Sequence, residues 1–197
     1  MKLFWAKGFE GTSLEDLQKA MGGITPPSFY HAFGSKDALF KEALSLYIDS
    51  VGSAGPQALN EAATAREGIE GMLRAAVESF SQSGKPCGCM LLTGAMNCTP
   101  ANQEIQAYAK AVRSSAPEAI KQRLKRARKE GDIPADADIR RLASFYTTVA
   151  QGMAIRAGDG ARRPELMADV DAAMSAWDYL TKPRRQSEAR PAARKKA

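Results

Sequence analysis

Apolar residues recur every three or four positions along most of the chain, which is the spacing of one face of an α-helix. The clearest stripe consists of Ile139, Leu142, Ala143, Tyr146, Val149, Ala150, Met153 and Ala157. A second stripe follows Pro164 and consists of Leu166, Val170, Ala173, Met174, Trp177 and Leu180. Alternating apolar and polar positions, which predict strands, do not extend over any useful length. The pattern therefore predicts an all-α fold.

Start and stop signals divide residues 1–50 into short helices. Ser13 is followed three residues later by an acid, which is the pattern of a capping box, and the helix that it opens ends at the glycine pair beginning with Gly22. Pro27 suits the first turn of the next helix, and a third helix is predicted over residues 36–50. We therefore predict a small helical N-terminal domain.

Residues 52–63 are rich in glycine, proline and small residues, so we expect a break between this domain and a helical body over residues 51–181. Thr64 and Glu67 form a second capping-box pattern, which opens the first long helix of the body. Residues 182–197 are charged, contain proline and lack a large apolar residue, so we predict a basic, disordered tail there.

The formal net charge is +6, which by itself favours a polyanionic partner. The charge is unevenly placed, because residues 182–197 hold seven basic residues and one acidic residue. The remainder of the chain holds 21 of each and is neutral, and residues 1–50 hold five basic and six acidic residues. The charge outside the tail therefore gives no argument for nucleic-acid binding.

Composition argues against several other classes of protein. The three cysteines are an odd number, which argues against a disulfide scaffold and for a reducing compartment, so we expect a cytoplasmic protein. No apolar run reaches the roughly 18 to 20 residues of a membrane helix, so we expect no membrane association. With one histidine, no nucleophile beside a base and no phosphate-cradling loop, we expect no enzyme, no cofactor and no metal.

The segment from Gly8 to Phe40 carries the most specific pattern. Two short helices joined by a tight glycine turn describe a helix-turn-helix, whose second helix fits the major groove of DNA. Phe29 and Phe33 are four residues apart and can pack inward together. Four residues are left near the outer face of that helix: Thr25, Ser28, Tyr30 and His31.

These residues also resemble the N-terminal domain of the tetracycline-repressor (TetR) family of bacterial regulators. The family pattern stands here as Phe4, Gly8-Phe9, Thr12-Ser13, Leu14 to Met21, Gly22, Tyr30, Phe33, Ser35-Lys36 and Leu39-Phe40. The rest of the chain is similar in architecture to the family's ligand-binding and dimerisation domain. The resemblance implies a transcriptional repressor that binds a double-stranded DNA operator as a homodimer.

By this resemblance, Tyr30 and Lys36 bind DNA phosphates, and Thr12 joins them. Three further residues present side chains toward the bases or the backbone: Thr25, Ser28 and His31. From the residues alone, Tyr30 could instead be a core tyrosine with its hydroxyl at the rim, and His31 an ordinary exposed histidine.

The sequence departs from the family pattern in two places. The family turn usually has one glycine, whereas Gly22 and Gly23 both precede Ile24 here, which could change the entry angle of the second helix. The family's first helix normally begins well upstream of Phe4, so we expect either an earlier start or a domain that lacks part of its bracing helix. In the second case Trp5 and its neighbours would be poorly covered.

The two C-terminal stripes suit a symmetric four-helix dimer interface, although they could also face the core of the body. Gly152 would permit close approach of two backbones. The expected interface residues are Ile139, Leu142, Tyr146, Val149, Gly152, Met153, Val170, Met174 and Trp177.

A small apolar effector is expected in the body, where its binding would tilt the helix over residues 36–50 and lower operator affinity. The candidate lining residues are Met72, Phe80, Leu91, Met96, Tyr108, Val112 and Phe145, each of which could equally be a core residue.

Two alternatives stay open beside this ligand-responsive repressor. Cys87, Cys89 and Cys98 could form a redox or soft-metal sensor on the same DNA reader, or they could be ordinary small residues at a turn. The chain could also be a helical dimerisation protein that has lost DNA binding together with part of its first helix.

Overall fold

The structure is a computed structural model, and it describes residues 1–182. Those residues form helices joined by short loops, which confirms the all-α prediction. The helices are α1 (Lys2–Lys7), α2 (Leu14–Ala20), α3 (Pro26–Phe33), α4 (Lys36–Ser50), α5 (Ala54–Glu61), α6 (Ala65–Phe80), α7 (Met90–Thr93), the 3-10 helix η1 (Pro100–Asn102), α8 (Gln103–Arg113), α9 (Ser115–Glu130), α10 (Ile139–Gly158), α11 (Arg163–Ser175) and α12 (Trp177–Thr181). The predicted tail lies outside the described residues, apart from Lys182.

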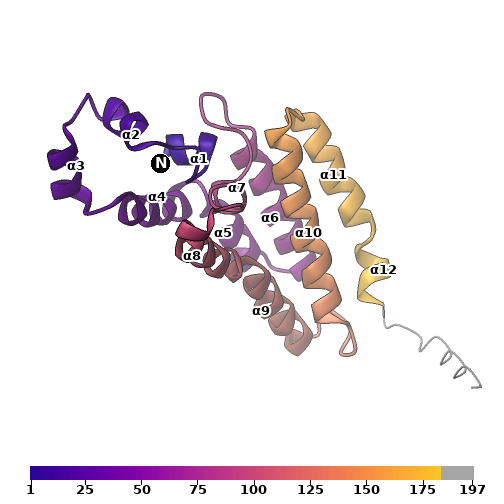
Figure 1. Cartoon of the computed structure of the whole chain (residues 1–197). Coiled ribbons are helices and arrows are strands. Elements are labelled where there is room, and N and C mark those ends of the chain that lie inside the picture. Colours follow the sequence, from indigo (N-terminus) through magenta and orange to yellow (C-terminus); the bar gives the residue numbers. More distant parts are fainter. Residues whose placement is uncertain (183–197) are drawn as a thin grey trace, which may run out of the picture.

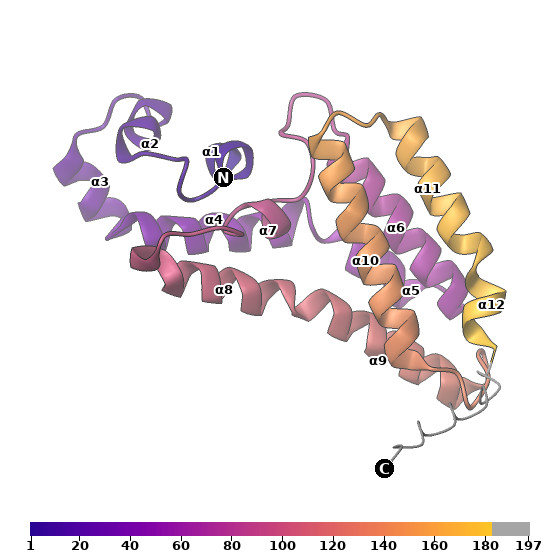
Figure 2. The same cartoon turned by 45° about the vertical axis from the view of Figure 1, so that its right-hand side comes forward.

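The molecule has a small helical head at one end and a helical body at the other. Helices α1 to α4 form the head, and α6, α10 and α11 run side by side in the body (Figure 1). Figure 2 shows α4 extending from the head toward the body, with α7 and α8 beside it. We call α1–α4 the reader. In the part of the chain that the structure describes, no helix combines the length and the apolar character needed to cross a membrane.

The predicted helix signals act as expected at most positions. Thr64 forms a capping box in which its hydroxyl accepts from the Glu67 N–H and the Glu67 carboxylate accepts from the Thr64 N–H. Pro27 lies in the first turn of α3, and Gly131 ends α9 with φ 78°, in the left-handed region that favours glycine.

The predicted break over residues 52–63 is wrong, because α5 occupies most of it. This short helix contains Gly55 and Pro56, which indicate a turn in the sequence, and it buries one large side chain, Leu59, against the body core. Its Pro56 lies near the first turn, where a missing N–H is tolerated.

Two hydrophobic clusters hold the chain together, and the boundary between them does not follow the sequence. The body core draws on α5, α6 and α9–α12. The reader core contains the packed rings of Phe4, Phe9 and Phe40, with centroid distances of 5.2 to 6.2 Å. It is completed by four residues of the segment from α7 to α8: Met90, Ala95, Ile105 and Ala109. The reader therefore shares its core with the body.

Arg123 of α9 is almost fully buried, with 2% of its surface exposed. Its Nε donates to the carbonyl of Leu59 at 3.2 Å, and its Nη2 donates to the carbonyls of Ala62 and Ala63 at 3.2 and 3.4 Å. These carbonyls lie at the C-terminal end of α5, where a helix leaves acceptors without intrahelical partners. Arg123 thus joins α9 to the end of α5.

We expect Arg123→Met to lower the free energy of unfolding by about 1–3 kcal/mol, because the buried carbonyls lose their donors. Arg128 is an exposed arginine of the same helix, and Arg128→Met should change that free energy by less than about 0.5 kcal/mol. Urea unfolding measures both variants. Equal effects would contradict the role of Arg123 at the end of α5.

Candidate DNA-binding interface

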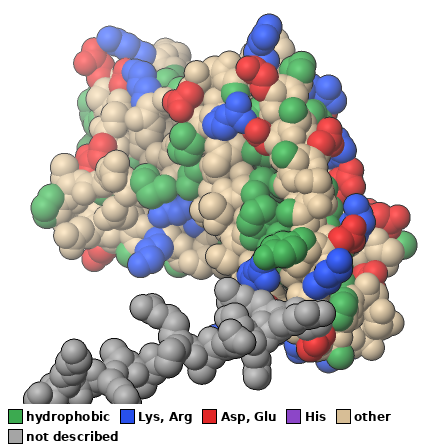
Figure 3. Space-filling view, turned by 90° about the vertical axis from the view of Figure 1, so that its right-hand side faces the viewer, with side chains coloured by type: hydrophobic (Ala, Val, Ile, Leu, Met, Phe, Trp, Pro, Cys, Tyr) green, Lys and Arg blue, Asp and Glu red, His purple; other side chains and the backbone are tan. Residues whose placement is uncertain are grey.

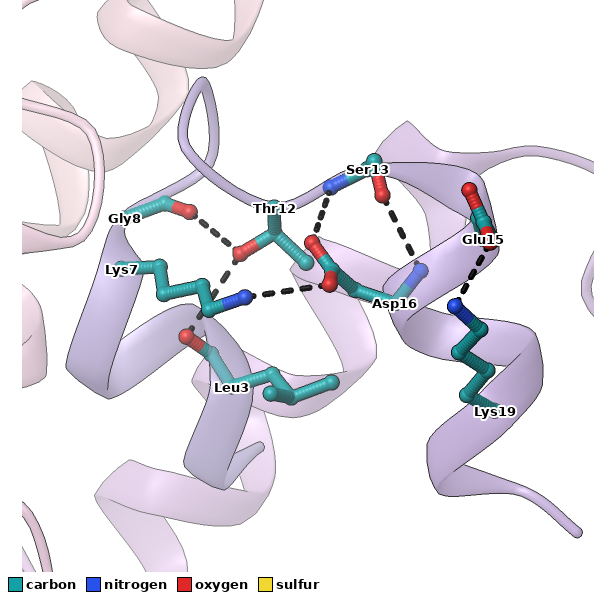
Figure 4. A network of polar contacts seen from close by, with 8 residues as sticks. All are labelled: Leu3, Lys7, Gly8, Thr12, Ser13, Glu15, Asp16 and Lys19. Atoms are coloured by element: carbon teal, nitrogen blue, oxygen red, sulfur yellow. Dashed lines mark hydrogen bonds and ion pairs between the residues drawn. The ribbon is translucent and has the colours of Figure 1, made fainter.

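The start of α2 is fixed by a network of polar contacts that joins it to α1 (Figure 4). The Ser13 hydroxyl accepts from the Asp16 N–H at 3.0 Å, and the Asp16 carboxylate accepts from the Ser13 N–H at 3.0 Å. The ammonium of Lys7 lies 3.0 Å from the other Asp16 oxygen. These bonds, that of the Ser13 backbone above all, lower the pKa of Asp16 to about 2. The carboxylate therefore orients α2 in its ionised form.

The turn between α2 and α3 uses both glycines of the pair. Gly22 and Gly23 have φ of 83° and 79°, in the left-handed region that residues with a Cβ rarely adopt. Neither glycine is forced by crowding, because a Cβ at either position would meet no atom within 4 Å. The second glycine is therefore a conformational requirement of this turn.

Helix α3 presents two different faces. Phe29 is fully buried, and its ring contacts those of Phe33 and Tyr30 at centroid distances of 5.3 and 5.6 Å. The opposite side is open to solvent, and it carries the four residues expected there: Thr25, Ser28, Tyr30 and His31. Tyr30 is 51% exposed, so it is not a core tyrosine.

Thr25 caps α3, because its hydroxyl accepts from the Ser28 N–H at 3.4 Å. The hydroxyls of Thr25 and Ser28 also lie 3.0 Å apart. Both side chains thus have a structural task at the start of the helix, and both remain exposed to an incoming partner.

Lys36 begins α4, three residues after α3 ends. Its ammonium lies 4.2 Å from the centroid of the Phe9 ring, a cation–π contact that orients the side chain. Burial lowers the pKa of Lys36, although Glu10 and Asp37 oppose that shift. The residue is half-buried in the first turn of α4.

The structure contradicts the expected phosphate contact of Thr12. Its side chain is fully buried, and its hydroxyl donates to the Gly8 carbonyl at 2.6 Å. The Leu3 carbonyl lies 3.5 Å from the same hydroxyl. Thr12 therefore holds the loop before α2 against α1. Phe4 and Trp5 are buried as well, with 0% and 3% exposed, so the expectation that they lack cover is wrong.

Most of the expected dimer-interface residues lie in the body core of the same chain. Seven of them are at most 8% exposed: Ile139, Leu142, Tyr146, Met153, Val170, Met174 and Trp177. Val149 is partly buried, and Gly152 is exposed. The stripes reflect burial within the monomer, so their assignment to an interface fails for these seven residues.

The expected effector-lining residues do not surround one cavity. Met72, Phe80 and Phe145 pack in or against the body core. Leu91 and Val112 pack against the reader core, and Met96 and Tyr108 are exposed. A hollow of about 440 Å³ lies elsewhere, between the end of α4 and α6, and its lining includes Ser50, Val51, Ala75 and Ser79.

The three cysteines have free thiols and different surroundings. Cys87 is exposed, whereas Cys89 packs against both hydrophobic clusters, and the Tyr47 hydroxyl donates to its sulfur at 3.5 Å. Burial raises the pKa of Cys98. Within residues 1–182 no group of three or more His, Cys, Asp or Glu side chains is arranged to hold a metal ion, which contradicts a soft-metal site built from the three thiolates.

Glu10 and Tyr47 make contacts that no pattern in the sequence indicates. Tyr47 lies on α4 and reaches Cys89, 42 residues later. Glu10 bonds to Thr99 and Asn102, 89 and 92 residues later. Such pairs carry no local pattern, so only the folded chain brings them together.

Comparisons with known proteins agree with this arrangement of reader and body. The family described as bacterial regulatory proteins, tetR family, matches residues 1–43, and that described as tetracyclin repressor-like, C-terminal domain, matches residues 65–169. The chain is 30% identical over 183 residues to the HTH-type transcriptional repressor ComR of Escherichia coli K12, covering 92% of this chain and 87% of ComR. It is also 30% identical over 167 residues to the repressor BdcR of the same organism, covering 84% of this chain and 79% of BdcR.

Among solved structures, the chain is similar to a cysteine mutant of the regulator CifR in complex with 26-base-pair double-strand operator DNA. The TM-score is 0.86 at 39% sequence identity, and the match covers 89% of this chain and 92% of that one. The likeness includes both the head and the body.

The lowered pKa of Asp16 predicts how stability depends on acid. In the unfolded chain this carboxyl returns toward its ordinary pKa of 3.8, so its contribution is present above about pH 4 and is lost as the pH falls toward 2. We expect Asp16→Asn to flatten the loss of thermal stability over that range. Glu15→Gln removes only an exposed ion pair with Lys19 and serves as control. An unchanged pH profile for Asp16→Asn would contradict this role.

Proposed function

Because the chain belongs to the TetR family of bacterial regulatory proteins, we propose that it is a homodimeric, cytoplasmic repressor that a small-molecule effector releases from its operator. The observation that carries this proposal is the two-faced character of α3, which buries Phe29 and leaves its polar side open. A helix held on one side by its own domain and free on the other can enter a major groove.

The exposed groups around α3 would make two kinds of contact with DNA, one to phosphates and one to base edges. Tyr30 and Lys36 would contact phosphates, which position the reader without specifying sequence. Thr25, Ser28 and His31 would face base edges or backbone. The apolar surfaces of Pro26 and Pro27 would suit a thymine methyl group.

A dimer would present two such readers to half-sites about 34–36 Å apart. The surface best suited to a second copy is the outer face of α10 and α11, where Gly152 and Ile155 are exposed together with Ala168 and Ala172. A Cβ at Gly152 would meet no atom within 4 Å, so a partner backbone can approach closely there. Figure 3 looks onto this side of the molecule, where hydrophobic side chains gather beside a mixed border of acidic and basic ones.

The effector would act through α4, which runs from the reader into the body. Its end is held to α6, because the Ser79 hydroxyl donates to the Val51 carbonyl at 3.2 Å beside the 440 Å³ hollow. An effector that binds a displaced position of α4 more tightly would draw the dimer away from the geometry that fits DNA.

Cys89 supports a second candidate function, release of DNA by oxidants. Its sulfur accepts a hydrogen bond from the Tyr47 hydroxyl of α4, so oxidation of the thiol would disturb the same helix. Hydrogen peroxide should then release DNA from the wild type and not from Cys89→Ser. Equal release from both would contradict a sensor at this position.

Salt dependence tests the proposed phosphate contacts. The test uses a DNA duplex that the wild-type chain selects from a random pool. Lys36→Met should weaken binding to it and reduce the slope of the logarithm of affinity against the logarithm of salt concentration by about one. Lys110→Met changes an exposed lysine of α8 on the body and should leave both unchanged. Fluorescence anisotropy over a range of salt concentrations measures the slope. A wild-type slope in Lys36→Met would contradict the assignment.

Ile155 tests the proposed dimer face, because 46% of its surface is exposed on α10. We expect Ile155→Glu to shift the chain from dimer to monomer in sedimentation velocity, since two like charges would be buried at a symmetric interface. Leu46 of α4 is a matched exposed aliphatic residue, and Leu46→Glu should remain dimeric. Persistence of the dimer in Ile155→Glu would overturn this face.

A further inference from the structure

In the turn between α1 and α2, one carboxylate oxygen of Glu10 accepts three hydrogen bonds from the body. Oε1 of Glu10 accepts from the backbone N–H of Thr99 at 2.7 Å and from the Thr99 hydroxyl at 2.9 Å. It also accepts from the side-chain amide of Asn102 at 2.9 Å. A second bond within that segment, from the Asn102 amide to the Thr99 hydroxyl at 3.3 Å, aligns the two donors.

The residues next to Glu10 dock onto the same region of the body. The Phe9 N–H donates to the carbonyl of Gly94 at 2.6 Å. Gly8 has φ 72° and lies so near this segment that a Cβ there would be 3.5 Å from the Gly94 oxygen. Three consecutive residues, Gly8 to Glu10, therefore meet the segment from Gly94 to Asn102.

Hydrogen bonds to an ionised acceptor are stronger than bonds between neutral groups. The three donors lower the pKa of Glu10, so its carboxylate is charged at neutral pH. The contact is exposed and screened, which limits its effect on overall stability. Its position matters more, because the turn that Glu10 belongs to leads directly into α2 and then α3.

We propose that Glu10 is a positioning residue, which holds the reader on the segment from Thr99 to Asn102 and so sets the angle at which α3 is presented to DNA. The inference rests on the proposed homodimer, in which two readers must match two half-sites. Loss of the contact would leave the core that the reader shares with the body in place, but the turn before α2 would be less restrained on the segment from Thr99 to Asn102.

A fixed angle has a consequence that stability alone does not produce. Two rigidly held readers accept one separation of half-sites, whereas loosely held readers tolerate others. Glu10 should therefore determine how strongly the dimer discriminates between operators that differ only in the number of base pairs between half-sites.

The experiment compares a duplex selected from a random pool by the wild-type chain with versions that carry one or two extra central base pairs. We expect Glu10→Ala to reduce the ratio of affinities for native and lengthened duplexes by about threefold or more, the effect of a modest coupling between contacting groups. Glu10→Gln keeps an oxygen acceptor at the same position and should preserve most of the ratio. Glu15→Ala changes an exposed acid of α2, paired with Lys19 alone, and should behave as wild type.

Asn102→Ala provides the other half of a double-mutant cycle. If the two residues act through one contact, the double variant should show no greater loss of discrimination than Glu10→Ala. Far-UV circular dichroism and the thermal midpoint check that each variant is folded.

A wild-type ratio in folded Glu10→Ala would overturn the positioning role while leaving the proposed repressor intact. Additive losses in the double variant would also overturn it. A wild-type chain that binds every spacing equally would contradict both the inference and the proposed dimeric function.

Discussion

The reader cannot complete its hydrophobic core from its own helices, and much of the structure follows from this constraint. Met90, Ala95, Ile105 and Ala109 are each at most 3% exposed, and all four pack into the cluster built around the aromatic rings of α1 and α4. Small domains bury a limited fraction of their surface, so borrowed apolar residues matter to their stability. The body thereby becomes part of the domain that carries α3.

The shared core explains why contacts between the reader and the body concentrate on one segment. Residues 89–102 contain the thiol that accepts from Tyr47, the carbonyl that accepts from Phe9 and the donors that bind Glu10. A movement of this segment must shift α1, α4 or both. A ligand can therefore change the orientation of the reader with a small displacement, provided that it binds one arrangement more tightly than the other.

Local chemistry made several helix starts predictable from sequence. Capping boxes and prolines in a first turn act over a few residues, so Ser13 and Thr64 mark helix starts where the sequence indicates them. The exposed residues of α3 follow from the same local pattern, and their contacts with DNA stay predictions.

Roles that depend on tertiary burial could not be predicted from the sequence. The stripe through Leu142 and Tyr146 shows that one face of α10 is buried, but the pattern is the same whether the partner is the body core or a second chain. Thr12 resembles a surface polar residue until its hydroxyl is seen bonded inside the reader. Glu10 has partners about half a chain away, which no local pattern indicates.

The shared core makes the most direct test a comparison of unfolding in the two parts. The chain has two tryptophans, with Trp5 in the reader and Trp177 in the body. In Trp177→Phe the remaining fluorescence reports the reader, and in Trp5→Phe it reports the body. Within each variant we predict that fluorescence and far-UV circular dichroism give the same urea midpoint, because reader and body unfold together. A reader signal that changes at clearly lower urea than the helical signal would contradict the shared core as the constraint that joins them.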